Sequence, residues 1–274
     1  MIKKGEKCVL YLLDINNCEI SKLRLVKLMF LISEQIHLYD FIPYKYGPFS
    51  FQLYHDLSRL EKCNLISIKN NSVSLVGQNQ TQPDTKTKKI IRAYSRKFAD
   101  FDDKYLLDYI YDKYPEYTIL SCYKKLIEFD SESSGLVTIG YEGKSIDSFL
   151  NELIINKISV VIDVRRNAYS MKFGFSDRKL RDYLDKINIE YIHMADLGIP
   201  SDLRKDLVTH DDYQSLFVEY AKELDDKQDL LKFIEDVGSN KKAALMCFEK
   251  DVNYCHRSVI AEKLRADDIK VIDL

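Results

Sequence analysis

The second half of the chain alternates short apolar runs with amphipathic stretches, and this alternation constrains the fold more than any other feature. The apolar runs cover residues 135–140, 159–164, 189–193, 243–248 and 270–273. Helical patterns cover residues 145–155, 176–186, 213–224, 230–237 and 258–265. Strands buried on both faces of a parallel sheet read as continuous apolar runs. The pattern predicts an α/β domain with a Rossmann-like, mostly parallel sheet covered by helices.

The first 80 residues have a different pattern. An amphipathic stretch follows Ser21, a possible helix cap, and a second one begins after the turn at Gly47-Pro48, where Ser50 can serve as the cap. Two alternating runs then flank Asn70-Asn71, which predicts a hairpin. Helix, turn, helix and hairpin is the order of a winged helix. Its second helix offers four side chains for contact with base edges: Gln52, His55, Arg59 and Lys62.

Two polar segments, residues 77–83 and 130–135, mark the expected domain boundaries. We therefore predict a winged-helix domain over residues 1–80, a helical connector over residues 81–133 and the Rossmann-like domain over residues 134–274. The net charge of −2 conceals an asymmetry, because residues 1–130 hold 20 Lys and Arg against 16 Asp and Glu. The mild basic excess lies in the first half of the chain.

No run of the chain approaches the roughly 18 apolar residues of a membrane helix, and no signal peptide is recognisable at its start. We expect a cytoplasmic protein without a membrane partner. The six cysteines are too dispersed along 274 residues for a disulfide framework.

The predicted connector carries the densest group of basic residues. Lys88, Arg92 and Arg96 recur every four residues and would share one face of a helix. Such a stripe is typical of a surface that contacts the phosphates of DNA or RNA. The alternative is an ordinary solvated helix face.

Polar side chains follow four of the predicted strands. Ligands of such sheets bind beyond the carboxyl ends of the strands, so these side chains are expected to share one rim. They are Tyr141 and Glu142 after the first strand, Asp163, Arg165 and Arg166 after the second, His193 after the third, and Cys247, Glu249, Cys255, His256 and Arg257 after the fourth.

The types of these residues indicate a nucleotide, a nucleic acid or another small anionic ligand. Arg165, Arg166 and Arg257 can bind phosphate, Tyr141 can stack on a base, and His193, Cys255 and His256 complete the ligand-binding set. The candidate catalytic residues are Glu142, Asp163, Glu249 and Cys247. Paired carboxylates suit hydrolysis or transfer at a glycosidic or phosphate bond. Cys247, at a strand end before a basic loop that leads into a helix, suits a thiolate nucleophile.

We expect no metal and no cofactor. Zinc is the alternative, with Cys247, Cys255, His256 and His193 as its ligands. Two features oppose it: neighbouring residues such as Cys255 and His256 rarely point into one site, and the chain has no Cys-x-x-Cys spacing.

Two resemblances add to these inferences. The segments Thr138–Gly143, Ile162–Arg165, Cys247–Glu249 and Cys255–Arg257 resemble the family catalogued as domain of unknown function 488, which implies the same polar rim but no particular activity. Family members often have Pro where this chain has Asn167-Ala168, so the shape of that loop is open. The Tyr44–Ser50 turn makes the N-terminal part similar to SocA/Panacea antitoxin-like winged-helix modules.

Two functions follow as hypotheses. In the first, a winged helix delivers an enzyme, a hydrolase or transferase, to nucleic acid or to a nucleotide. In the second, the α/β domain is a non-catalytic ligand sensor, and the winged helix is an antitoxin-like regulator that binds DNA or a protein partner. The acidic residues of the rim favour the enzyme.

Overall fold

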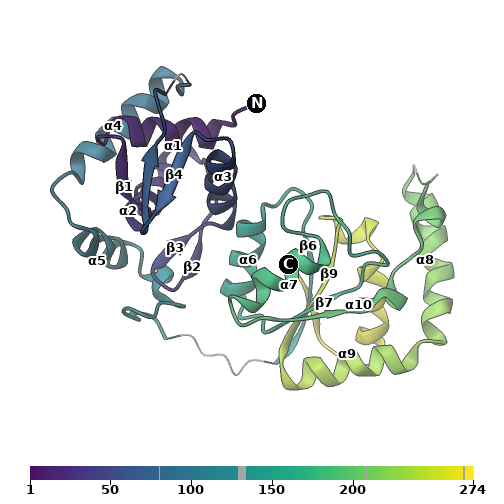
Figure 1. Ribbon diagram of the computed structural model, residues 1–274. Coiled ribbons are helices and arrows are strands. Elements are labelled where there is room, and N and C mark those ends of the chain that lie inside the picture. Colours follow the sequence, from purple (N-terminus) through teal and green to yellow (C-terminus); the bar gives the residue numbers. More distant parts are fainter. Residues whose placement is uncertain (80, 129–133, 206, 208, 268) are drawn as a thin grey trace. The chain divides into compact units, whose positions relative to one another are not determined.

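The computed structural model describes residues 1–274 apart from 80, 129–133, 206, 208 and 268. The chain forms two compact units, Met1–Glu128 and Phe129–Leu274 (Figure 1). The predicted boundary segment 130–135 lies mostly outside the described residues. Each unit has its own hydrophobic core, and each is described by itself.

The N-terminal unit combines helices with short antiparallel strands. Its helices are α1 (Lys4–Asp14), α2 (Lys22–Ile36), α3 (Phe51–Lys62), α4 (Thr85–Lys97), α5 (Asp103–Lys113) and the 3₁₀ turn η1 (Pro115–Thr118). Its strands are β1 (Glu19–Ser21), β2 (Ile42–Tyr44), β3 (Gly47–Phe49), β4 (Ile66–Lys69) and β5 (Ser72–Leu75). They form a sheet in the order β1-β5-β4 and a separate β2-β3 hairpin.

The two helix caps and the hairpin turn predicted for this unit are present in the structure. Ser21 Oγ accepts the Arg24 N–H at 3.0 Å, and Ser50 Oγ accepts the Leu53 N–H at 3.1 Å, so each serine caps a helix. Asn70 and Asn71 both have positive φ, as the two-residue turn between β4 and β5 requires. The winged-helix assignment of the unit as a whole stays a prediction.

Residues 81–133, which the sequence sets apart as a connector, contribute α4 and α5 to the first unit. Ile91, Phe98, Leu106 and Ile110 are fully buried in the same core as α1 and α2. Residues 129–133 lie outside the described part of the chain.

Lys27 is an unusual member of this core. The residue is only 3% exposed, and its Nζ donates a hydrogen bond to the Pro48 carbonyl oxygen at 2.9 Å. Burial lowers the pKa of Lys27 from 10.5 to about 7, because an apolar environment disfavours the charged form.

We expect the free energy of unfolding to rise with pH between about 7 and 10.5, because the unfolded chain then holds a proton that buried Lys27 has lost. Below pH 7 the buried charge destabilises the unit in full. Lys27→Met should remove this pH dependence and stabilise the protein at neutral pH, since one pKa unit corresponds to about 1.4 kcal/mol.

Urea denaturation followed by circular dichroism at about pH 7 and about pH 9 checks this expectation. Lys62→Met, at an exposed position, is the control. An unchanged pH dependence in Lys27→Met would contradict it.

The C-terminal unit is an α/β domain, as predicted. Its strands are β6 (Gly135–Gly140), β7 (Val160–Asp163), β8 (Glu190–His193), β9 (Lys242–Cys247) and β10 (Val271–Asp273). Its helices are α6 (Ile146–Ile155), α7 (Asp177–Asp185), α8 (His210–Asp225), α9 (Gln228–Asn240) and α10 (Arg257–Ala266), with 3₁₀ turns η2 (Ala195–Leu197), η3 (Ser201–Arg204) and η4 (Val252–Tyr254). The strand order is β10-β6-β9-β7-β8, and every pair is parallel. The Rossmann-like sheet is confirmed.

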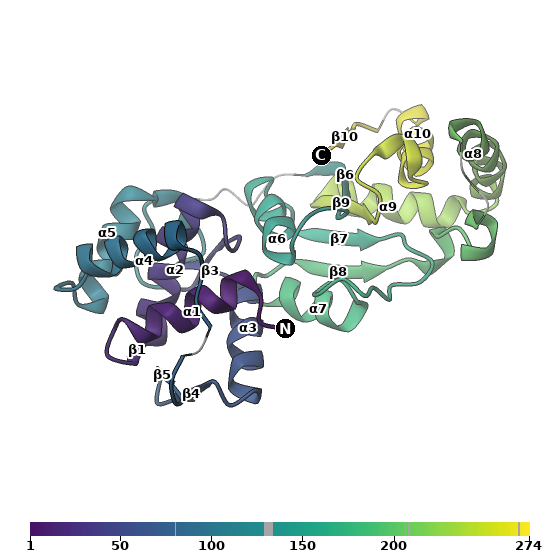
Figure 2. The ribbon, with the colours of Figure 1, turned by 90° about the horizontal axis from the view of Figure 1, so that it is seen from above.

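The helices cover both faces of this sheet (Figure 2). Side chains from α8, α9 and α10 share one core with alternate residues of β6, β7 and β9, whereas α6 and α7 lie on the opposite side. The chain therefore leaves β9 toward one face, while it leaves the neighbouring strands β6 and β7 toward the other. In sheets of this type, ligands bind at the carboxyl ends of the strands where the connections diverge.

Among the helices in the described ranges, none has the length and apolar character that crossing a bilayer would require.

Candidate functional site

The candidate site lies at the carboxyl end of β9, where the chain directions diverge. β9 ends at Cys247, and α10 begins at Arg257. The loop between them contains Glu249, Cys255 and His256, so five of the eleven residues predicted for the rim come from the short segment 247–257.

This loop is fixed against the end of β6. The backbone N–H groups of Tyr141 and Glu142 donate to the Phe248 carbonyl oxygen at 3.1 and 2.8 Å. The Glu142 carboxylate accepts the Lys250 N–H at 3.0 Å. Gly140 permits this approach, because a Cβ there would lie 1.9 Å from the carbonyl oxygen of residue 249. The loop therefore has a defined position at the carboxyl ends of β6 and β9.

Arg257 holds the same loop through its side chain. The residue is 1% exposed, and its guanidinium donates to the carbonyl oxygens of Glu249 and, at 3.0 Å, Lys250. Its Nε also donates to Thr138 Oγ1 at 3.3 Å. These internal contacts make Arg257 a residue that positions the loop, and they leave the predicted phosphate contact without support from the geometry.

The loop gathers two thiols, an imidazole and a carboxylate. The ligand atoms of Cys247, Cys255 and His256 all lie within 4.8 Å of one another, and all three residues are buried. Cys247 Sγ donates to Glu249 Oε2 at 3.3 Å and lies 3.7 Å from His256 Nδ1. The side chain of Glu249 is 24% exposed, so solvent reaches the cluster through this carboxylate.

The electrostatics of the cluster follow from burial and hydrogen bonding. Burial raises the pKa of the Glu249 carboxyl, but hydrogen bonds from the Cys255 thiol, its own backbone N–H and the Cys247 thiol lower it further, so the net pKa lies below its usual value. Burial raises the pKa of the Cys255 thiol well above its usual value. Glu249 is therefore ionised at neutral pH, while the thiol of Cys255 keeps its proton.

The predicted thiolate nucleophile is not favoured by this arrangement. Cys247 is 1% exposed, and its sulfur faces the negative carboxylate of Glu249. Reactive thiolates lie in partly exposed environments with positive charge nearby. Glu249 is the better candidate for proton transfer.

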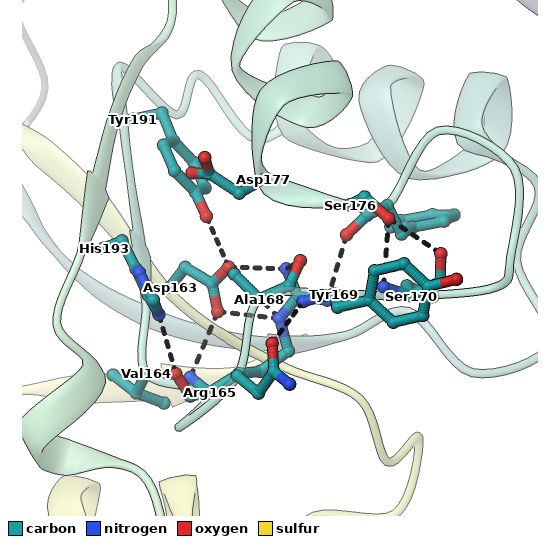
Figure 3. A network of polar contacts seen from close by, with 12 residues as sticks. Asp163, Val164, Arg165, Ala168, Tyr169, Ser170, Ser176, Asp177, Tyr191 and His193 are labelled. Atoms are coloured by element: carbon teal, nitrogen blue, oxygen red, sulfur yellow. Dashed lines mark hydrogen bonds and ion pairs between the residues drawn. The ribbon is translucent and has the colours of Figure 1, made fainter.

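Asp163, the last residue of β7, is fully buried within a network of polar contacts (Figure 3). Arg165 donates to its carboxylate through Nε at 2.8 Å and Nη2 at 2.6 Å, and Tyr191 donates at 2.6 Å. Arg165 Nη1 also donates to Tyr141 Oη at 2.8 Å and to the Phe175 carbonyl oxygen at 3.0 Å. Asp163 and Arg165 thus neutralise each other inside the domain.

The neighbouring rim residues are engaged in the same way. Tyr141 is 3% exposed and stacks on Phe175 with ring centroids 4.2 Å apart, so it presents no open face to a base. His193 Nε2 donates to the Arg165 carbonyl oxygen at 2.8 Å, away from the thiols. Arg166 is half exposed and pairs with Asp196 at 3.1 Å. Within the predicted rim, Glu142 and Arg166 are exposed, and His193 and Glu249 are partly exposed.

Two contacts of the cluster were not predicted from the sequence. Arg204 Nη1 lies 3.6 Å from Glu249 Oε1, and the Tyr220 ring meets the His256 ring edge-on with centroids 5.7 Å apart. Both residues come from the segment between β8 and β9, which has no motif. Only the folded sheet brings them to the end of β9.

The basic stripe of the first unit lies on α4 as predicted. Lys88 Nζ and the Arg92 guanidinium lie 5.8 and 5.7 Å from the centre of the Tyr11 ring, and Arg92 and Arg96 are exposed. Contact with nucleic acid at this stripe stays a prediction.

On α3, the helix expected to read bases, long polar side chains are engaged inside the unit. Gln52 Nε2 donates to Asp56 Oδ1 at 3.0 Å, and Arg59 pairs with buried Glu6.

The fold and the cluster together define a Rossmann-like α/β domain with a thiol, imidazole and carboxylate site at the switch point of its sheet. Residues 145–264 match the family described as "Domain of unknown function DUF488". This match confirms the resemblance of the C-terminal domain, and the N-terminal resemblance is unconfirmed. No curated protein and no solved structure matches the chain.

We expect Arg165→Ala to destabilise the α/β domain by about 3–5 kcal/mol, because it leaves the buried carboxylate of Asp163 without its charged partner. Arg166→Ala removes only an exposed ion pair and should cost at most about 1 kcal/mol. Urea denaturation of both variants measures the difference. Equal stability of the two neighbouring variants would show that the Asp163 pair is not structural.

Proposed function

We propose that the C-terminal domain is a hydrolase or transferase that acts on a nucleotide or a nucleic acid, with Glu249 as its general acid or base. The observation that carries this proposal is the position of Glu249. It is an ionised, partly exposed carboxylate among otherwise buried reactive groups, at the point where ligands of such sheets bind.

The surface beside Glu249 supports a ligand with bases and phosphates. Phe248 and Tyr254, on either side of it in the loop, are 41% and 39% exposed. Exposed aromatic rings are the platforms on which nucleobases stack. Arg204, 3.6 Å from the Glu249 carboxylate, and exposed Lys250 add positive charge for phosphate.

The N-terminal unit is proposed to contribute nucleic-acid affinity through α4. The exposed guanidinium groups of Arg92 and Arg96, with Lys88 on the same helix, suit phosphates, which carry no sequence information. We propose a cytoplasmic location for this activity, as the sequence predicts.

An antitoxin-like regulator is the second candidate, and one observation favours it for the N-terminal unit. Gln52 and Arg59 of α3 are bound to carboxylates of their own unit, which leaves this helix poorly equipped to read base edges. A protein partner needs no such side chains.

We expect Glu249→Gln to lower hydrolysis or transfer by about 10²- to 10⁴-fold, because an amide cannot exchange the proton that the carboxylate carries. Turnover of nucleotides and oligonucleotides by the full chain is the measurement. Glu262→Gln, at an exposed position of α10, is the control and should leave turnover unchanged.

If Glu249→Gln weakens binding of the same compounds while the unaltered chain turns over none of them, the domain is a sensor. If the unaltered chain neither binds nor converts any of them, the proposal fails.

We expect Lys88→Ala, Arg92→Ala and Arg96→Ala together to weaken oligonucleotide binding uniformly across sequences and to reduce the slope of log affinity against log salt. Each basic side chain that binds a phosphate should account for about 1 in that slope. Fluorescence anisotropy at several salt concentrations measures both effects. Lys104→Ala is the control for removal of an exposed charge elsewhere in the first unit, on α5. An unchanged slope in the triple variant would exclude α4 as the phosphate-binding surface.

A further inference from the structure

We infer that Cys247, Cys255 and His256 form a zinc site whose remaining coordination position faces Glu249. The ligand atoms of these three residues lie within 4.8 Å of one another. Cys247 Sγ and His256 Nδ1 are 3.7 Å apart. In a tetrahedral zinc site with ordinary bond lengths, a sulfur and a nitrogen ligand lie about 3.6 Å apart. The side chains are therefore spaced for the ion with little rearrangement.

The imidazole of His256 is prepared for this role by its outer contact. Its Nε2 lies 2.9 Å from the Val164 carbonyl oxygen, which can only accept a hydrogen bond. The proton of a neutral imidazole is therefore held on Nε2, and the lone pair of Nδ1 points toward the thiols. Metal-binding histidines are commonly fixed by such a hydrogen bond from the other ring nitrogen.

The donor set selects the kind of metal. Two thiols and an imidazole are soft to intermediate ligands that suit zinc, whereas magnesium and calcium require oxygen ligands. The polar contacts of Cys247 are made with Glu249 and His256, which belong to the same cluster. Packing alone would not require these groups to converge.

The backbone explains how adjacent residues reach one site. Cys255 is extended, with φ −128° and ψ 130°, whereas His256 is already helical, with φ −58° and ψ −16°. The chain turns from the η4 segment into α10 between them, so both side chains face Cys247. The sequence-based objection to zinc, that neighbouring residues diverge, fails at this turn. The other objection, the lack of a Cys-x-x-Cys spacing, also fails, because the fold brings Cys247 at the end of β9 next to Cys255. His193 is bound to the Arg165 carbonyl oxygen and is not needed as a ligand.

Three protein ligands leave one position for water, as in catalytic zinc sites. Glu249 Oε2 lies 3.3 Å from Cys247 Sγ and would therefore stand beside this position. There the carboxylate would accept a proton from the water, which would leave a hydroxide for attack on the substrate. This last step rests on the proposed function, whereas metal binding does not. Binding also releases the protons of both thiols, so affinity should fall as the pH is lowered.

Cobalt titration of the reduced full chain tests the site directly. We expect one equivalent to bind and to give a thiolate-to-cobalt charge-transfer band, which zinc then abolishes by displacement. Metal analysis of protein purified without chelator should give one zinc per chain. This measurement needs no variant and no enzymatic activity.

Variants then locate the ligands. Cys255→Ser should reduce zinc affinity by more than the roughly 10- to 100-fold that removal of an outer hydrogen-bond partner costs. Cys63→Ser, which removes an exposed cysteine of the first unit, should bind zinc normally. Circular dichroism checks that both variants are folded.

Absence of the charge-transfer band in the reduced chain would overturn the inference, as would equal loss of metal in Cys63→Ser. Zinc binding without turnover of any nucleotide would leave the metal site standing and would refute the proposed function. Full turnover by metal-free protein would refute the assigned role in water activation.

Discussion

The candidate site depends on one interaction, the hydrogen bonds that the buried Arg257 guanidinium donates to the carbonyl oxygens that follow β9. Those carbonyls belong to the segment that carries Glu249, and the same segment is bonded to the end of β6 by backbone hydrogen bonds. A charged group removed from water is stable only when its donors are satisfied, so the arginine and the loop fix each other. The carboxylate is thus held at the carboxyl end of the sheet, with β9 before it and α10 after it in the chain.

Charged groups at this edge divide into two kinds that a sequence does not distinguish. Asp163 and Arg165 form a buried ion pair, and Arg257 donates hydrogen bonds to backbone carbonyl oxygens. Glu249, in contrast, accepts hydrogen bonds from buried groups and is also in contact with solvent. Both kinds follow parallel strands and have the same residue types. What separates them is whether internal partners saturate their hydrogen-bonding capacity, which depends on side chains from several elements at once.

The strands and helices of the C-terminal domain were predictable because their apolar periodicity is strong and each is flanked by turn residues. The caps at Ser21 and Ser50 were predictable for a similar local reason. The convergence of Cys255 and His256 was not, because it depends on a change of backbone conformation between two adjacent residues. The contact of Arg204 with Glu249 was also hidden, since it joins segments that are distant in sequence and carry no shared pattern.

At Gly140 the backbone of the β9–α10 loop lies so close to β6 that the position has room for a hydrogen atom but not for a Cβ. A chain of otherwise similar sequence that carries alanine at this place must lift its β9–α10 segment off the neighbouring strand. Its acidic side chain would then occupy a different position even if every reactive residue were retained. The residue at the position of Gly140 therefore indicates whether a related domain places its carboxylate as this one does, although that residue takes no part in the chemistry.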